Sequence, residues 1–444
     1  MYPTRRVSGD ICVCSRKEKE PNVTDFETVD FFTDPALVPD PYPYFDHLRS
    51  KCPVSHATPF NVLAVTGYDE ALAVYKDPTF SSCVSVAGPF SGLPFGPGER
   101  DDVSELIEEH RLAVPMGEHI TSQDPPLHTR TRGLMNKLIT PKRLKENEDF
   151  MWRLADQQLD TFADRGSAEF LADYAKPFSL LVIADLLGVP GEDHEEFKAA
   201  FALETVGELG KEAPTTHNPL QWLNDKFYAY IEDRRRAPRD DVLTGLAQAK
   251  YEDGSTPDIE DVMNLSTFLF AAGTETTTKL VSSAVRFIAD NPGFETMLRD
   301  DRGRIPSFLE ETLRMESPVK SHFRMASRTT SIGDVEVPAG TTVMVLPGAC
   351  NRDARKFPDP DVFHPDRTNV REQIAFIRGV HSCPGAPLAR AEGRISLNRI
   401  LDRMSDITIS TEHHGPAEDR QYTYEPTFIM RGLSELHIEF KPAA

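Results

Sequence analysis

The stretch from Thr256 to Asp290 constrains the fold most, because it is typical of one long helix. It spans roughly 34 residues, which at 1.5 Å per residue makes a rod of about 50 Å. Apolar residues flank its centre on more than one face: Leu265, Phe268, Leu269 and Phe270 before it, and Leu280, Val281 and Val285 after it. A helix that is apolar around its axis is buried. We therefore expect this helix to cross the whole molecule, with the rest of the chain packed around it.

The centre of this helix, Ala271–Thr278, has a poor helix sequence, AAGTETTT. Glycine is flexible, and threonine is β-branched and can hydrogen-bond back to the preceding turn. We expect a local bulge at this point. By itself the segment would fit a solvated polar patch on a surface helix, but its apolar flanks argue against that interpretation.

The remaining patterns predict a mainly α protein with a minor β-rich part. Helical spacing dominates from Pro141 to Asp290. Near the N-terminus we expect a helix at 44–50, a strand at 61–66, a helix at 68–76 and a long loop over 84–118. Residues 332–337 and 342–346, with a turn at 337–340, are typical of a β-hairpin. We find no repeat and no linker, so one large folded unit is preferred.

Composition narrows the classes of function. The 444 residues carry a net charge of −21 and a pI near 5.1, which disfavours binding to nucleic acid or anionic membranes. Small neutral substrates fit better. The six cysteines are too sparse for a disulfide framework and favour a cytoplasmic protein. The N-terminus lacks an apolar run for a signal peptide or membrane anchor. We expect residues 1–25 to form a flexible tail, and assign its Cys12 and Cys14 no function.

Cys383 is the candidate functional cysteine. It lies in the segment Phe376–Gly385, which leads directly into a predicted helix with regularly spaced apolar residues. At a helix start, the positive end of the helix dipole and unpaired backbone N–H groups stabilise a thiolate. Gly379 and Gly385 let the backbone approach a flat ligand. A buried structural cysteine is the common alternative. A zinc site is disfavoured because the loop supplies only one His-x-Cys pair and no second pair of ligands follows. This loop alone does not exclude a catalytic cysteine nucleophile with His381 as its general base.

The residues Phe376, Gly379, His381, Cys383, Gly385 and Leu388-Ala389-Arg390 are spaced as in the haem-binding loop of the cytochrome P450 monooxygenases, which this segment resembles. One departure is Ile377, where that family often has glycine. The resemblance implies a single triangular catalytic domain over 26–444. It also implies haem b with Cys383 as the axial thiolate, and Phe376, Gly379, His381 and Gly385 as haem-binding residues.

Other motifs carry the same resemblance in the same order. The central helix resembles the family's oxygen-binding helix, which implies that Ala272 contacts haem and that Glu275 and Thr276 relay protons to dioxygen. His128 and Arg132, one turn apart, together with Arg324 and His381, match the family's partners of the haem propionates. Glu311 and Arg314, followed by Phe363–Arg367, resemble its buried Glu-Arg-Arg network. We assign Glu311, Arg314 and Arg367 a structural role.

The implied activity is insertion of one oxygen atom from O2 into a small, largely apolar organic substrate. Because no reductase segment is visible, a separate ferredoxin and ferredoxin reductase would supply electrons, docking on basic residues such as Arg378, Arg390, Lys137 and Arg143. We expect a monomer. The alternatives are a peroxide-using haem-thiolate oxygenase, which has less need of the Glu275–Thr276 pair, and a non-catalytic haem- or ligand-binding protein.

The resemblance also places a substrate pocket, without identifying the substrate. It would be lined by the 84–118 loop, Phe268, Ala272, residues 319–323 and Thr427-Phe428. Lys320 is an unusual charge there. It could meet an anionic group of the substrate, but we expect a salt bridge or a turn outward to solvent. Terpenoids, steroids, fatty acids and aromatic compounds all stay open.

Overall fold

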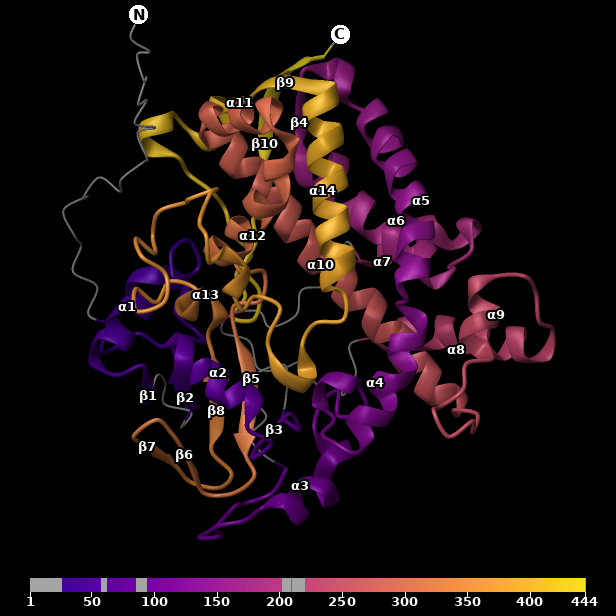
Figure 1. Ribbon diagram of the computed structural model, residues 1–444, viewed down its shortest axis with the longest axis vertical. Coiled ribbons are helices and arrows are strands. Elements are labelled where there is room, and N and C mark those ends of the chain that lie inside the picture. Colours follow the sequence, from indigo (N-terminus) through magenta and orange to yellow (C-terminus); the bar gives the residue numbers. More distant parts are fainter. Residues whose placement is uncertain (1–25, 57–61, 85–93, 202–208, 210–219, 444) are drawn as a thin grey trace, which may run out of the picture.

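The structure is a computed structural model that describes residues 26–56, 62–84, 94–201, 209 and 220–443. The expected N-terminal tail with Cys12 and Cys14 lies outside the described residues. In Figure 1 the strands β1, β2, β8 and β5 occupy one corner, and most of the long helices fill the opposite side.

The long central helix is α10, Ile259–Asp290. It begins slightly later than the sequence suggests, with Asp258 at its N-cap. Helices α6, α8, α12 and α14 pack against it, so most of its length is buried. It runs diagonally through the molecule in Figure 1.

The bulge expected at the centre of α10 is absent, since the helix is continuous from Ile259 to Asp290. The hydroxyl of Thr274 donates to the carbonyl of Phe270 (2.9 Å), and that of Thr278 to the carbonyl of Thr274 (3.0 Å). These bonds follow the helical ladder and do not interrupt it. A π-helical turn occurs instead at Leu171–Ala175, before α6.

Helices make up most of the described chain, as expected. Their bounds are α1 Tyr42–Lys51, α2 Tyr68–Lys76, α3 Ser104–His110, α4 Leu127–Leu138, α5 Pro141–Asp160, α6 Lys176–Leu187, α7 His194–Phe201, α8 Gln221–Arg236, α9 Val242–Ala247, α11 Pro292–Asp300, α12 Ile305–Met315, α13 Pro347–Cys350, α14 Ala386–Arg403 and α15 Thr411–His414. The predicted N-terminal helices correspond to α1 and α2. The predicted 84–118 loop is wrong in part, because 104–110 forms α3, whose Ile107 is buried in an apolar cluster.

The strands form three small sheets. A five-stranded sheet has the order β1-β2-β8-β5-β3, a three-stranded sheet the order β4-β10-β9, and a two-stranded sheet contains β6 and β7. Their bounds are β1 Val54–His56, β2 Val62–Val65, β3 Phe80–Ser81, β4 Ser167–Glu169, β5 His322–Ala326, β6 Thr330–Ile332, β7 Val335–Val337, β8 Thr342–Val345, β9 Met404–Ile409 and β10 His437–Pro442.

The predicted hairpin between 332–337 and 342–346 is wrong. β7 pairs with β6, whereas β8 pairs in parallel with β2 and antiparallel with β5. The turn at 338–341 therefore carries the chain from one sheet to another. β8 pairs with the distant strands β2 and β5 and not with β7, because it is buried along most of its length between them.

The helical core and the sheets meet around the start of α14. α14 packs against α5, α10 and α12, while the segment just before it packs against α2. The part of the chain that precedes α14 is thus held between the helical side and the five-stranded sheet. Within the described ranges, no helix combines the length and apolar character needed to span a bilayer.

A buried histidine at the end of α15, beside the C-terminal sheet, should make stability depend on pH. His414 is 1% exposed, and its Nε2 accepts the backbone N–H of His437 (2.9 Å). Its Nδ1 bonds the carbonyl of Gln421 (3.1 Å). Burial lowers the pKa of His414, and the ring of His437 lowers it further, whereas Glu435 opposes the shift. The neutral ring is therefore the form that fits the folded protein.

We predict that the free energy of unfolding falls as the pH drops through about 6.5, where the unfolded chain gains this proton first. A His414→Gln variant should lose part of that slope, measured by urea unfolding at pH 7.5 and 5.5. The control is His413→Gln, whose ring is exposed. Equal slopes in the parent and His414→Gln would contradict the assignment.

Candidate functional site

Cys383 lies three residues before α14, in a loop that its own backbone hydrogen bonds hold closed. The N–H of Cys383 donates to the carbonyl of Phe376 (2.9 Å), and that of Ser382 to the carbonyl of Gly379 (3.1 Å). Residues Gly379–His381 form a single 3-10 turn. These bonds fix the Cys383 side chain relative to the helix that follows.

The sulfur of Cys383 faces the backbone N–H groups at the start of α14. The N–H groups of Gly385 and Ala386 donate to it, and the guanidinium groups of Arg132 and Arg390 are nearby. All four favour a thiolate, as expected from the sequence. Burial opposes them and outweighs them, so that the pKa of Cys383 is raised above its usual range. A bound metal cation would supply the missing stabilisation, because coordination deprotonates a thiol.

Two residues of the loop have left-handed backbone conformations. Gly379 has φ of +78°, and a Cβ there would lie 2.3 Å from the carbonyl oxygen of Tyr75 in α2. Glycine is required on both grounds. Ile377 has φ of +59°, which explains why glycine is frequent at this position in the resembled family. The Ile377 side chain packs against the apolar cluster around the five-stranded sheet.

Next to this loop, three separate segments bring four basic side chains together. The rings of His128 from α4 and His381 lie 4.2 Å apart. Arg132, one turn further along α4, donates to the carbonyl of Ser382 (2.8 Å). Arg324 on β5 acts electrostatically on both histidines. We call His128, Arg132, Arg324 and His381 the basic cluster.

The basic cluster is arranged for an anion. Burial and the charge of Arg324 lower the pKa of His381 to about 3, and burial also lowers the pKa of His128. His128 is 3% exposed, and its Nε2 has no hydrogen-bond partner. Arg324, also buried, donates to the carbonyl of Phe323. The buried ring nitrogen of His128 without a partner, beside two arginines, suits carboxylates such as the propionates of haem.

One member of this neighbourhood was missed by sequence reasoning. His322 lies two residues before Arg324 on β5 and shares a hydrogen bond with the hydroxyl of Tyr75 (2.9 Å between Nδ1 and Oη). Burial and Arg324 lower its pKa to about 3. Residues two apart on a strand share a face, so the available signal was the period of β5.

The centre of α10 exposes a narrow face although its flanks are buried. Ala272 is exposed, and Thr276 one turn later is half-buried, with its hydroxyl donating to the carbonyl of Ala272 (2.8 Å). Gly273 sits against Ile183 of α6, 3.2 Å from where a Cβ would stand. Glu275 is ion-paired with Lys279 (2.8 Å). The acid and the alcohol are thus adjacent on an accessible part of the helix.

The Glu-Arg-Arg residues form a buried network away from these groups. Glu311 accepts two bonds from Arg314 (both 2.8 Å) and one from Arg367 (3.1 Å). Arg314 also donates to the carbonyls of Asn351 and Pro360. This network ties α12 to the segment that leads into the Cys383 loop.

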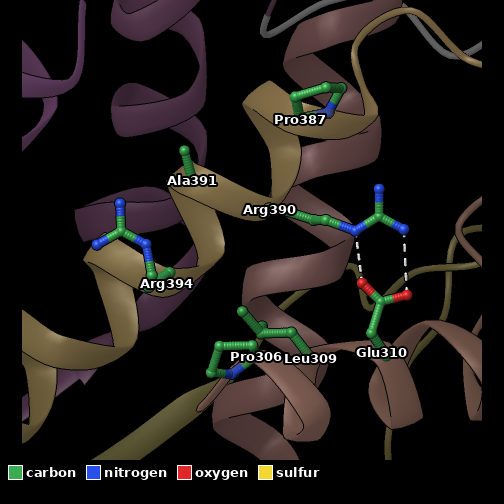
Figure 2. Close-up of a pocket in the computed structure, with 7 residues that line it drawn as sticks. All are labelled: Pro306, Leu309, Glu310, Pro387, Arg390, Ala391 and Arg394. Atoms are coloured by element: carbon green, nitrogen blue, oxygen red, sulfur yellow. Dashed lines mark hydrogen bonds and ion pairs between the residues drawn. The ribbon is translucent and has the colours of Figure 1, made fainter. Parts of the chain in front are cut away.

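A groove of about 280 Å³ lies between α12 and the start of α14. Figure 2 shows Pro387, Arg390, Ala391 and Arg394 on one wall and Pro306, Leu309 and Glu310 on the other. Arg390 is ion-paired with Glu310, and its guanidinium stacks on Phe376, 4.7 Å from the ring centre.

The basic residues suggested for docking a redox partner are only partly available. Besides the Arg390–Glu310 pair, Arg378 donates to the carbonyls of Arg371 and Gln373, and Arg143 to that of Leu186. Lys137 is exposed and donates to the carbonyl of Lys250.

Of the residues expected to line a substrate pocket, Lys320 differs from expectation. It neither forms a salt bridge within the described residues nor turns outward, since it is 5% exposed. Its ammonium donates to the carbonyl of Thr427 (2.6 Å), and burial lowers its pKa to about 7. Phe268 is half-buried, and Phe428 is buried in an aromatic group with Phe32. Much of the 84–118 loop lies outside the described residues.

These residues fit haem better than a metal ion held by protein alone. Among the residues that the structure describes, no three His, Cys, Asp or Glu side chains are grouped to hold a metal ion. Cys383 offers a single sulfur ligand, and the basic cluster offers donors for carboxylates. One thiolate with a separate anion site matches a flat iron cofactor that carries acidic groups.

Comparisons with known proteins agree with this fit. The cytochrome P450 family model matches residues 199–421. Cytochrome P450 107B1 of Saccharopolyspora erythraea is 30% identical over 413 residues, 91% of this chain and 96% of that protein.

Two solved structures are similar throughout. Substrate-free cytochrome P450 CYP150A6 of Mycobacterium marinum is 58% identical, with a TM-score of 0.88 over 94% of this chain and all of that one. P450BioI, solved with hexadec-9Z-enoic acid ligated acyl carrier protein, is 28% identical, with a TM-score of 0.76 over 91% of this chain and 99% of that one.

The close approach at Gly379 gives a prediction. Gly379→Ala should lower the free energy of unfolding for two reasons. A left-handed backbone conformation costs an alanine about 1–2 kcal/mol. The clash of its Cβ with the carbonyl oxygen of Tyr75 costs about 1–3 kcal/mol more. The control is Gly254→Ala, at φ of +82° with no atom within 4 Å of the added Cβ. Urea unfolding of both variants measures the difference. Equal losses would mean that the contact with Tyr75 contributes nothing.

Proposed function

Since the chain belongs to the cytochrome P450 family, we propose that it inserts one oxygen atom from O2 into a small, largely apolar organic substrate, with Cys383 as the ligand of its haem iron. It is a monooxygenase, and members of its family hold haem iron through a cysteine thiolate. The observation that carries the assignment of Cys383 is the position of its sulfur, before α14 and facing the N–H groups of Gly385 and Ala386.

The chain's own residues have distinct tasks in this proposal. Arg132, Arg324, His128 and His381 bind the two propionates, and His322 extends this set from the same face of β5. Phe376, whose carbonyl accepts the N–H of Cys383, and Gly385, next to the sulfur, would contact the haem, as would the small side chain of Ala272 on α10. Gly379 lets the loop approach α2. When bound, the haem supplies the reduction of dioxygen and the oxidation of a C–H bond.

Thr276 and Glu275 move protons. Each turnover consumes protons, because the second oxygen atom leaves as water. The Thr276 hydroxyl rotates from the Ala272 carbonyl, donates its proton toward dioxygen and takes a proton from the Glu275 carboxyl. Glu275 then regains a proton from solvent. Their adjacency on the accessible part of α10 supports this relay.

Electrons come from a separate ferredoxin and its reductase. The groove beside Arg390 and Arg394 lies at the first turns of α14, close to Cys383, and supports docking there. Since Arg390 is already paired with Glu310, its contribution to attraction is small. We infer a monomeric, cytoplasmic enzyme, which the sparse cysteines and the strong net charge support.

Isotope labelling separates this function from its alternatives. A screen for the haem spin-state shift with steroids, terpenoids, aromatic compounds and free hexadec-9Z-enoic acid identifies a substrate. We predict that turnover with NADPH, a surrogate ferredoxin and its reductase under 18O2 yields product carrying one 18O atom. Label from peroxide, with none from 18O2, would establish the peroxide-using alternative. No product from either oxidant would indicate a binding protein.

Removing the Thr276 hydroxyl should uncouple NADPH consumption from product formation. We predict that Thr276→Ala lowers the product formed per NADPH at least about tenfold, because positioned proton transfer contributes factors of this size or more. The matched control, Thr276→Ser, retains the hydroxyl and most of the coupling. Unchanged coupling in Thr276→Ala would remove Thr276 from the relay.

A further inference from the structure

Lys279 is a buried lysine held between two carboxylates. Its ammonium lies 2.8 Å from Oε1 of Glu275, one turn earlier on α10, and 2.6 Å from Oε2 of Glu425 in the C-terminal segment. The Lys279 side chain is only 3% exposed. The acid of the proposed relay is therefore coupled to a second acid, 150 residues away in the chain, through one shared cation.

Gly432 makes this arrangement possible. A Cβ at Gly432 would lie 2.4 Å from Cγ of Lys279 and 2.8 Å from Cδ, so the lysine stem crosses bare backbone there. The carbonyl of Gly432 also accepts the N–H of Glu425 (3.0 Å). One short segment thus provides both the space for the stem and the second carboxylate for its ammonium.

Charge is unbalanced within this group. Two carboxylates share one ammonium, which leaves one negative charge in excess. Lys176, at the start of α6, is the further charged group that acts on Glu425. Burial and the charge of Glu275 raise the pKa of Glu425, and Lys279 opposes that rise. The two carboxylates therefore compete for Lys279, and a proton on one strengthens the ion pair of the other.

We propose that Lys279 and Glu425 are positioning residues that set how readily Glu275 takes up the proton it delivers to Thr276. The inference rests on the proposed relay role of Glu275. Lys279 attracts the Glu275 carboxylate through their ion pair. Glu425 weakens that attraction by sharing the ammonium. The balance between them fixes the pH up to which Glu275 stays protonated.

Opposite charge changes should move the pH profile in opposite directions. Lys279→Gln removes the cation, so protonated Glu275 persists to higher pH, and the alkaline limb of the turnover rate moves upward by about one pH unit. Glu425→Gln removes the competing anion, and the limb moves downward. Lys142→Gln, in an exposed pair with Glu146 on α5, is the control and leaves the limb in place.

A second readout needs no turnover. Infrared difference spectra of the purified protein follow the protonation of buried carboxyls as the pH changes, and Glu425→Gln identifies its band. Lys279→Gln should move the carboxyl titration upward. If Lys279→Gln does not fold, Gly432→Ala is the alternative, because its Cβ displaces the Lys279 stem while every charge is retained. It should shift both the pH profile and the carboxyl titration in the same direction as Lys279→Gln, but by a smaller amount.

The outcomes separate this inference from the function on which it rests. Opposite shifts for Lys279→Gln and Glu425→Gln support the inference. No shift, or shifts in the same direction, overturn it if Glu275→Gln still slows turnover and abolishes the alkaline limb. If Glu275→Gln leaves turnover and its pH profile unchanged, the relay itself is wrong.

Discussion

The structure depends on holding one sulfur atom in a fixed, half-buried position. Cys383 can serve as a ligand only if its loop cannot rearrange, and four features prevent this. The loop closes on itself from Cys383 to Phe376, it presses on Tyr75 at Gly379, it begins from a segment tied to α12 by Glu311, and it ends in α14. Burial then makes the free thiolate unfavourable, so a metal cation is the natural partner of this sulfur.

The basic cluster and α10 extend that constraint to a flat cofactor. His128, Arg132, Arg324 and His381 come from α4, β5 and the cysteine loop, and meet only because the helical side and the five-stranded sheet adjoin there. The partly or fully buried positive charges of Arg132 and Arg324 would be costly without an anion. In the proposed function, the accessible part of α10 with Ala272 and Thr276 provides proton supply, while the basic cluster provides binding.

Local sequence patterns predicted the features that local chemistry controls. The periodicity of α2 and α10 predicted their extents closely, and the spacing around Cys383 predicted the candidate site. Features that depend on distant contacts were not predictable in this way. The pairing of β8 with β2 brings together residues far apart in the chain, so the local turn at 338–341 was misleading. The raised pKa of Cys383, the burial of Lys320 and the sharing of Lys279 by Glu275 and Glu425 all arise from packing.

The central claim is that Cys383 binds haem iron as a thiolate. The most direct measurement is the absorbance difference between the reduced protein with and without carbon monoxide, for the parent and a Cys383→His variant. A thiolate ligand from Cys383 should give a strongly red-shifted Soret band in the parent that is lost in the variant. A parent that takes up no haem, or whose band is typical of histidine ligation, would contradict it.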